Sequence, residues 1–367
     1  MPEILFLTAF LLQLFFYLSF FLFFSFRKPT LKLPGTTIPV SIVVCARNEA
    51  KNLDRLLPSL LVQDYPKIEL ILVDDGSVDE TLSVMRSFKA DNKKENLRIE
   101  VLSIPKGSAG GKKKALATGI RRASYDRILL TDADCRCASV NWVRQMMQPY
   151  EAGCKIVLGY GAYERIRGSF LNKLVRMETL LTALQYFSYA LSGRAYMGVG
   201  RNLSYEKEVF DRAGGFREHE DLLSGDDDLF VGQAARSVRT GVCDHPDSFT
   251  VSLPPGNFAE WIRQKRRHIT TSFRYSRMHQ ALLGTFYLSQ LLFYSMGIWL
   301  IATGGFRTLL LILVLIRFAV WYLAIGVAAV RLREKDLLTW APIYEISIIF
   351  IQSYLFLRNS LESPKRW

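Results

Sequence analysis

Two aspartates separated by one residue, Asp132 and Asp134, follow an apolar run of the chain. The run predicts a strand that begins in a core, and leaving unpaired carboxylates at its buried end costs several kcal/mol. A cationic partner is therefore expected beside them. Zinc is a weak interpretation, because Cys135 and Cys137 are one residue apart and no second Cys or His pair follows at structural-zinc spacing.

Segments that predict strands alternate with segments that predict helices in the first part of the charged region. The strands are predicted over residues 40–46, 69–77, 98–104 and 127–134, and the helices over residues 52–61, 79–91 and 112–123. This alternation predicts a parallel sheet with βαβ crossovers, in which ligands bind at the carboxyl ends of the strands. Polar side chains gather at these ends: Arg47, Asn48 and Glu49, then Asp74 and Asp75, then Asp132 and Asp134.

The glycine pair Gly110 and Gly111 precedes Lys112 at the start of a predicted helix. Neither a dinucleotide site nor a P-loop fits, because no G-x-G-x-x-G follows the first strand and GSAGGKKKAL lacks the Walker A spacing. Backbone N–H groups at a helix start still suit a phosphate. An exposed basic helix start explains this fragment equally well.

Long apolar segments lie near both ends of this 367-residue chain, which is 50% hydrophobic. Because a bilayer needs about 20 such residues, we expect one transmembrane helix in residues 1–28 and two more in residues 281–330. A weaker segment, residues 340–357, is expected to cross the membrane, to re-enter it or to lie in its interface. The mixed and charged residues 39–271 are predicted to form the soluble domain.

Basic residues flank the apolar segments, and the formal net charge is +13. The positive-inside rule then puts residues 39–271 and the loop at Arg331 in the cytoplasm of a multi-pass inner-membrane protein. Excess Lys and Arg on such a domain is typical of attraction to anionic membrane lipids. Nucleic acid is the least favoured partner, because no nucleic-acid-binding signature occurs. The sequence does not identify a protein partner.

One charged residue, Arg317, lies inside the third apolar segment. A charge in the middle of a transmembrane helix costs about 2.5 to 3.5 kcal/mol on insertion scales, so we expect it to face a partner or a polar cavity. The available acid is Glu345, which interrupts the fourth apolar segment.

Six motifs occur in the order found in one large enzyme family: VSIVVCARNEAKNL, LILVDDGSVDET, GGKKKALATGI, LLTDADC, GDDDLF and RQKRRH. The chain resembles the membrane-bound inverting glycosyltransferases with the GT-A fold, which include cellulose, chitin, hyaluronan and poly-N-acetylglucosamine synthases and ceramide glucosyltransferases. The resemblance covers residues 39–271 and extends to the membrane spans. It implies an α/β GT-A domain, Rossmann-like with a mostly parallel sheet, joined to N- and C-terminal transmembrane helices.

The resemblance also implies a nucleotide-sugar donor, with a UDP-sugar preferred, and a divalent cation at the two aspartates. It places Asp134 on Mg²⁺ or Mn²⁺, which favour hard carboxylate oxygens, and Asp132 near the ribose or the diphosphate. Further donor-binding positions of the family match Ala46 and Glu49 along the nucleoside, Asp75 on the base and Lys112 near the base or phosphates.

The downstream motifs match positions for catalysis and for the acceptor. By the resemblance, Asp227 is the catalytic base, and Gly200, Asn202, Asp226 and His268 lie on the acceptor side. Gln264 and Arg267 of the Q-x-x-R-W motif would bind the diphosphate, but His268 replaces the usual Trp, which weakens a prediction of long-chain polymerisation. The structural alternative is that the acids 226–228 simply cap a helix that begins near Leu229, and Asp226 or Asp228 is expected to do so in either case.

The predicted function is an inverting, metal-dependent glycosyltransferase that moves a sugar to a lipid or glycan acceptor at the cytoplasmic membrane face. One alternative is a polyprenyl-phosphate sugar transferase, which ordinarily lacks the RQKRRH region. Another is a catalytically silent membrane scaffold or sugar-binding subunit. Loss of the acidic motifs would favour the silent protein, and the chain keeps them.

Overall fold

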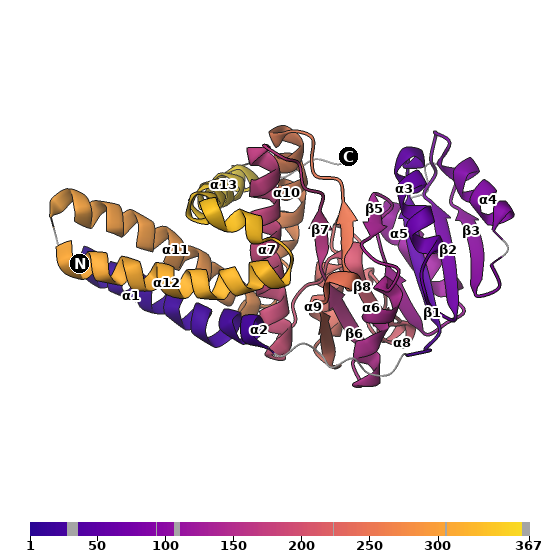
Figure 1. The fold of residues 1–367 in the computed structure, drawn as a ribbon, viewed down its shortest axis with the longest axis horizontal. Coiled ribbons are helices and arrows are strands. Elements are labelled where there is room, and N and C mark those ends of the chain that lie inside the picture. Colours follow the sequence, from indigo (N-terminus) through magenta and orange to yellow (C-terminus); the bar gives the residue numbers. More distant parts are fainter. Residues whose placement is uncertain (28–35, 93, 106–110, 223, 305–306, 362–367) are drawn as a thin grey trace. The chain divides into compact units, whose positions relative to one another are not determined.

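The computed structural model describes residues 1–27, 36–92, 94–105, 111–222, 224–304 and 307–361. The chain forms two compact units, which are described separately. The sheet unit consists of residues 29–165 and 193–254, and the helical unit of residues 1–28, 166–192 and 255–367. Figure 1 labels the elements of both units.

Two β-sheets form the centre of the sheet unit. Their strands are β1 (Val40–Ala46), β2 (Ile68–Asp74), β3 (Leu97–Ser103), β4 (Arg127–Leu130), β5 (Cys135–Cys137), β6 (Ile156–Gly159), β7 (Gly161–Tyr163), β8 (Leu203–Glu206), β9 (Thr240–Cys243) and β10 (Thr250–Ser252). The larger sheet has the order β3-β2-β1-β4-β8-β6-β9, and the smaller has the order β5-β10-β7. The strands β1 to β4 run parallel to one another, whereas β8 runs antiparallel to both of its neighbours.

Apolar side chains on alternate positions of the central strands cover both faces of the larger sheet. Ile42 and Val44 belong to a core that includes side chains of α3 (Ala50–Leu61) and α6 (Trp142–Glu151). Val43 faces α5 (Gly111–Arg122), where a Cβ atom on Gly119 would lie 2.6 Å from Val43 Cγ1. Burial on both faces is typical of parallel strands covered by crossover helices. The remaining helices are α4 (Thr81–Asp91), α8 (Lys207–Arg212) and α9 (Asp228–Ala234), with short 3₁₀ segments η2 (Gly200–Asn202), η3 (Arg217–His219) and η4 (Pro246–Ser248).

The α/β architecture predicted from the sequence is confirmed. The four predicted strands correspond to β1, β2, β3 and β4, and the three predicted helices to α3, α4 and α5. Strand β4 ends at Leu130, so Asp132 and Asp134 lie in the loop beyond its carboxyl end.

Long apolar helices make up most of the helical unit. Its elements are α1 (Pro2–Phe16), the π-helical turn η1 (Tyr17–Phe21), α2 (Leu22–Phe26), α7 (Phe170–Leu191), α10 (Phe258–Ser272), α11 (Arg277–Thr303), α12 (Arg307–Arg331), η5 (Lys335–Trp340) and α13 (Ala341–Leu361). Within the described residues, four helical segments are long and apolar enough to cross a membrane: Pro2–Phe26, Arg277–Thr303, Thr308–Arg331 and Lys335–Leu361. Helices α7 and α10 belong to this unit, although residues 39–271 include almost all of both.

Helices α1, α11 and α12 lie side by side (Figure 1). Helix α11 runs antiparallel to α1, because Phe6 stacks on Phe293 and Gln13 Nε2 donates to the Ser289 carbonyl at 3.0 Å. Helix α12 runs parallel to α1 and α2, because Arg317 contacts Tyr17 and, farther along, Arg331 donates to the carbonyl oxygens of Phe24, Ser25 and Arg27. The ends of α2 and α12 therefore lie together.

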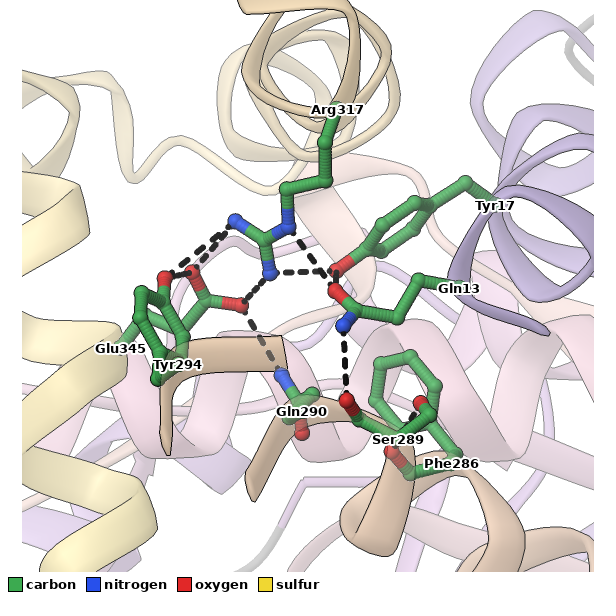
Figure 2. A network of polar contacts seen from close by, with 8 residues as sticks. All are labelled: Gln13, Tyr17, Phe286, Ser289, Gln290, Tyr294, Arg317 and Glu345. Atoms are coloured by element: carbon green, nitrogen blue, oxygen red, sulfur yellow. Dashed lines mark hydrogen bonds and ion pairs between the residues drawn. The ribbon is translucent and has the colours of Figure 1, made fainter. Parts of the chain in front are cut away.

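A buried polar network joins these helices to α13 (Figure 2). The Arg317 guanidinium donates to both carboxylate oxygens of Glu345, at 2.5 and 2.8 Å, and both side chains are at most 1% exposed. Arg317 also donates to Gln13 Oε1 at 2.8 Å and to the Tyr17 hydroxyl at 3.0 Å. The Glu345 carboxylate accepts hydrogen bonds from Gln290 and from Tyr294. These contacts confirm the prediction that Glu345 is the partner of Arg317.

Charge reversal tests the strength of this pair. Removing one partner of a buried pair typically costs about 3 to 5 kcal/mol, so Arg317→Glu or Glu345→Arg alone should sharply reduce the yield of folded protein. The double variant should recover much of that yield, measured by size-exclusion chromatography in detergent. Arg358→Glu, on the exposed part of α13, is the matched control and should fold normally. A double variant that folds no better than the worse single variant would contradict the pairing.

Candidate active site

The predicted donor residues lie where the strand order of the larger sheet reverses. From β1 the chain proceeds to β2 and β3 on one side, and then returns to β4 on the other side. The carboxyl ends of β1 and β4 therefore form a topological switch point, which is where ligands bind in open α/β sheets. Glu49 follows β1 and Asp132 follows β4, so the loops that carry them meet at this edge.

Hydrogen bonds join the turns that follow β1 and β2. Asn48 has a φ of 58°, which Asn tolerates better than most residues, and its side chain accepts from the Val78 amide at 2.9 Å. Asp74 is buried and accepts hydrogen bonds from the Ser77 amide and the Ser103 hydroxyl. Asp74 therefore shapes the turn. Asp75 keeps a partly exposed side chain, and burial raises its pKa despite the nearby charge of Arg47.

Ala46 and Glu49 lie at the same edge. Ala46 is buried at the end of β1, and its carbonyl accepts a hydrogen bond from the Asp75 amide at 2.9 Å. The Glu49 carboxylate accepts a hydrogen bond from Asn52 at 2.5 Å. Burial raises the pKa of Glu49, and the charges of Asp134 and Asp132 act in the same direction. The charges of the two aspartates thus act on the ionisation of Glu49.

Lys112 bridges two acidic segments of the site. Its ammonium lies 2.9 Å from Asp132 Oδ1 and 3.2 Å from Asp226 Oδ2. Although burial disfavours the charged form, the Asp132 and Asp226 carboxylates raise the pKa of Lys112 well above its usual range. The opposite shift occurs at Asp226: burial raises its pKa, but the charge and hydrogen bond of Lys112, a backbone hydrogen bond and the charge of Lys113 together lower it below its usual value. Gly110 lies outside the described residues, so its predicted approach to a phosphate stays a prediction.

Asp134 lies in surroundings that disfavour its ionised form. Burial and then the charge of Asp132 raise the pKa of Asp134, and the positive charge of Arg201 opposes this shift. Arg201 lies 4.3 Å from the centre of the Tyr163 ring and donates to the Gly161 carbonyl at 2.8 Å. Arg201 was not among the predicted site residues, although it is the one cation in the glycine-rich run GVGRN.

The residues around Asp134 fit a hard divalent cation that binds together with a phosphate ligand. In the part of the chain that the structure describes, no group of three or more His, Cys, Asp or Glu side chains could hold a metal ion. Mg²⁺ is usually held by one or two carboxylates together with substrate phosphates and water. Asp132 and Asp134 supply carboxylates of that kind.

The carboxylate of Asp227 differs from those of its two neighbours. It accepts hydrogen bonds from the Gly200 amide and the Asp228 amide, both at 2.8 Å. Burial and the charges of Asp226 and Asp228 raise the pKa of Asp227 to about 7. Asp226 and Asp228 are each 7% exposed, whereas Asp227 is partly exposed. A partly accessible carboxyl group that titrates near neutral pH is suited to general base catalysis.

The helix predicted to begin near Leu229 is present, but its cap is Asp227 rather than Asp226 or Asp228. Helix α9 begins at Asp228, and its N-cap is Asp227, whose side chain accepts from the Asp228 amide. The side chain of Asp228 instead accepts from the Leu229 amide inside the first turn.

The two acceptor-side residues in the GVGRN run occupy different environments. A Cβ atom on Gly200 would lie 3.5 Å from Asp227 Oδ2 and 3.8 Å from Lys112 Nζ, so Gly200 borders the site. Asn202 is fully buried: it accepts from Trp142 Nε1 and donates to two carbonyl oxygens. Asn202 therefore holds the loop in place from inside, and its predicted acceptor-side role stays a prediction.

Gln264, Arg267 and His268 lie on α10, in the helical unit. Their spacing of three and four residues puts them on one side of the helix. Their assignment to the diphosphate and the acceptor stays a prediction.

Comparison with known proteins agrees with the fold and the motifs. The model of Glycosyl transferase family 2 matches residues 41–214, and that of Glycosyl transferase family group 2 matches residues 128–332. The solved structure of the mannosyltransferase PcManGT from Pyrobaculum calidifontis, in complex with GDP-Man and Mn²⁺, is 19% identical and covers 94% of this chain and 97% of that one, with a TM-score of 0.58. At that identity the likeness shows the GT-A fold alone.

Two curated relatives match a shorter part of the chain. A poly-beta-1,6-N-acetyl-D-glucosamine synthase of Staphylococcus epidermidis is 33% identical over 95 residues, which is 26% of this chain and 21% of that protein. A 4,4'-diaponeurosporenoate glycosyltransferase of Staphylococcus aureus is 32% identical over 112 residues, which is 30% of this chain and 28% of that protein. The chain thus aligns with less than a third of either relative. Because the model of Glycosyl transferase family group 2 covers more than half of its residues, the chain belongs to that family of glycosyltransferases.

Proposed function

We propose that the chain is an inverting glycosyltransferase that moves a sugar from a nucleotide-sugar donor to a hydroxyl group of a lipid or glycan acceptor. The observation that supports this most directly is the environment of Asp227. Its partly exposed carboxyl group has a pKa of about 7. Lys112 lies close to this carboxyl group and pairs with both Asp226 and Asp132, and Asp132 is assigned to the donor. A base beside a donor site is what a single displacement at a sugar carbon requires.

The donor half of the proposed site is the edge formed by the loops after β1, β2 and β4. Asp75 is assigned to the nucleotide base, with Ala46 and Glu49 along the nucleoside. Lys112 and Asp132 are assigned to the diphosphate and ribose. Gln264 and Arg267 are assigned to the diphosphate through the family motif, since a guanidinium fork suits phosphate oxygens.

A divalent cation, Mg²⁺ or Mn²⁺, is proposed to bind Asp134 together with the donor diphosphate. When bound, it would act as a Lewis acid for the departing nucleoside diphosphate. The chain contributes the carboxylates that hold it and the Lys112 charge beside them. The raised pKa of Asp134 is consistent with this assignment, because burial and the charge of Asp132 disfavour its ionised form, which a bound cation would stabilise.

Asp227 is proposed to take the proton of the acceptor hydroxyl. As that proton moves to the carboxylate, the acceptor oxygen forms a bond to the anomeric carbon of the sugar. The bond from that carbon to the diphosphate oxygen breaks on the opposite side, and the nucleoside diphosphate leaves. The Gly200 amide holds the carboxylate in place through its hydrogen bond.

The acceptor is proposed to arrive from the membrane, since the chain has helices long and apolar enough to cross it. The names of the two relatives refer to a glycan in one case and to diaponeurosporenoate in the other, so both acceptor classes are kept. The basic residues that flank the spans favour an inner-membrane protein with its sheet unit in the cytoplasm.

A panel of nucleotide sugars tests the proposal. Full-length protein in detergent with acceptor-containing membrane extract should release free nucleoside diphosphate from at least one donor. Asp227→Asn should lower turnover by about 100- to 10,000-fold, the usual contribution of a positioned base, and should leave donor binding unchanged. Asn caps helices as well as Asp does, so α9 should stay folded. Normal turnover in Asp227→Asn, with the loss seen instead in Asp226→Asn or Asp228→Asn, would show that the base is misassigned.

The pH profile gives a second test. A base must be ionised to accept a proton, so kcat/KM should fall as pH drops through the pKa of Asp227, which is about 7. We expect kcat/KM to decrease about tenfold per pH unit below pH 6 and to level off above pH 8. An acidic limb near pH 4 would mean that a carboxyl group with an ordinary pKa is the base.

The third test concerns the metal. Because two carboxylates alone make an incomplete site, Mn²⁺ should bind the free protein weakly and bind much more tightly when a nucleoside diphosphate is present. Asp134→Ala should abolish this nucleotide-dependent binding in calorimetry, and turnover should stop in chelator. Full turnover in chelator, or in Asp134→Ala, would refute the metal assignment.

A further inference from the structure

The last helix, α13, is held to its neighbours at two points. Near its start, Glu345 pairs with Arg317 of α12. Near its end, Asn359 accepts a hydrogen bond from Arg266 Nε of α10 at 2.9 Å and donates one to the Arg266 carbonyl at 3.0 Å. These two points define the depth of each end of α13 within the helical unit.

The start of α13 lies deep in the bundle. Arg317 is 14 residues before Arg331, the last residue of α12, which corresponds to about 21 Å along a helix. Arg331 is bonded to the carbonyl oxygens of Phe24, Ser25 and Arg27 at the end of α2. Glu345 is therefore about 21 Å from the end of the bundle at which α2 and α12 finish, well inside a hydrocarbon core about 30 Å thick.

The end of α13 returns to the side on which α12 finished. Glu345 accepts hydrogen bonds from Gln290 and Tyr294 of α11, whereas the later residue Ser353 meets Tyr287 at 2.5 Å. From Glu345 to Ser353, successive residues of α13 therefore contact residues of α11 that lie nearer to the start of α11. Because α11 runs antiparallel to α1, its start lies at the end of the bundle where α2 finishes.

The partner of Asn359 identifies the same side. Arg266 belongs to α10, which ends at Ser272 and is followed by α11 at Arg277. The chain therefore leaves the bundle at Arg331, reaches its middle at Glu345, and comes back to the side of α10 by Asn359. Figure 1 shows α13 beside α7 and α10.

We propose that α13 is a re-entrant helix that does not cross the membrane and that braces α10. Three of the described segments then cross the membrane: the first consists of α1 and α2 together, the second is α11, and the third is α12. This arrangement keeps Arg358 on the basic side of the membrane, where the positive-inside rule favours it.

The contacts of α10 support the brace. Lys265 pairs with Glu178 of α7 at 2.5 Å, and Arg266 is bonded to Asn359 of α13. These two links hold α10 from two sides, while Gln264, Arg267 and His268 share a further side of the same helix. Asn359 is therefore a positioning residue that acts through α10. Its effect on donor binding rests on the proposed function, whereas the topology does not.

Cysteine labelling tests the topology without any activity measurement. The experiment uses full-length protein carrying Cys45→Ser, in which the other four natural cysteines are buried. One added cysteine at a time replaces Ser360 of α13, Ser87 of the sheet unit or Thr303 at the far end of α11, all of them exposed. A membrane-impermeant maleimide is added to sealed vesicles of each orientation. Ser360→Cys should react from the same side as Ser87→Cys and from the side opposite to Thr303→Cys. Reaction of Ser360→Cys from the side of Thr303→Cys would overturn the re-entrant topology.

Hydrogen exchange tests the brace. Asn359→Ala removes both bonds to Arg266 and should speed amide exchange in α10 by about fivefold, as expected for the loss of hydrogen bonds of ordinary strength. Asn359→Asp keeps the acceptor for Arg266 Nε and should recover most of the protection. Ser360→Ala, whose hydroxyl donates to the Phe356 carbonyl within α13, is the matched control and should leave α10 unchanged. Unchanged exchange in Asn359→Ala, or equal effects in Ser360→Ala, would refute the brace.

The donor KM separates the brace from the proposed function. Asn359→Ala should raise the KM for the nucleotide donor severalfold with little change in kcat, and Asn359→Asp should restore it. If the natural chain turns over no donor, the proposed function fails while the labelling and exchange results still decide the brace. If turnover occurs and the KM is unchanged in Asn359→Ala, Asn359 does not position the donor-binding side of α10.

Discussion

Negative charge gathered at the carboxyl edge of the sheet is the constraint on which the site depends. Carboxylates this close to one another would repel and push the loops apart, or would become protonated, unless a cation offsets their charge. Lys112 supplies part of that offset, because its ammonium holds Asp132 and Asp226 in one place. The two neighbouring carboxyl groups respond differently: the pKa of Asp226 is lowered and the pKa of Asp227 is raised. Neighbouring carboxyl groups whose pKa values are separated in this way are typical of sites that need an acid and a base.

Buried charge also constrains the helical unit, but there the positive charge of Arg317 is fully paired with the negative charge of Glu345. Lipid tails are as apolar as leucine, so apolar packing alone does not decide which helices become neighbours. The Arg317 and Glu345 pair does decide it, because neither charge is stable in hydrocarbon without the other. Gln13, Gln290 and the two tyrosine hydroxyls satisfy the remaining donors and acceptors (Figure 2). The network thereby fixes α13 at one depth against three helices.

Much of the fold could be predicted because its signals are local. The apolar runs of β1 to β4, the helices between them and the long apolar segments each depend on a short stretch of sequence. The pairing of Arg317 with Glu345 could be predicted because few other charges lie in the spans. The burial of Asn202 could not, because it depends on Trp142 and Ser248, which are 60 and 46 residues away. The membership of α7 and α10 in the helical unit likewise depends on contacts between distant segments.

The position of Asp227 combines a helix cap with a raised pKa, and these two features conflict. A cap carboxylate normally benefits from ionisation, since the helix N-terminus carries partial positive charge and its amides donate to the oxygens. Here the Gly200 and Asp228 amides donate in that way, yet burial and the flanking aspartates outweigh them. A sequence selected for stability alone would not place three acids in a row at this cap. Local conflicts of this kind are expected at functional sites, which is consistent with the proposed role of Asp227 in proton transfer.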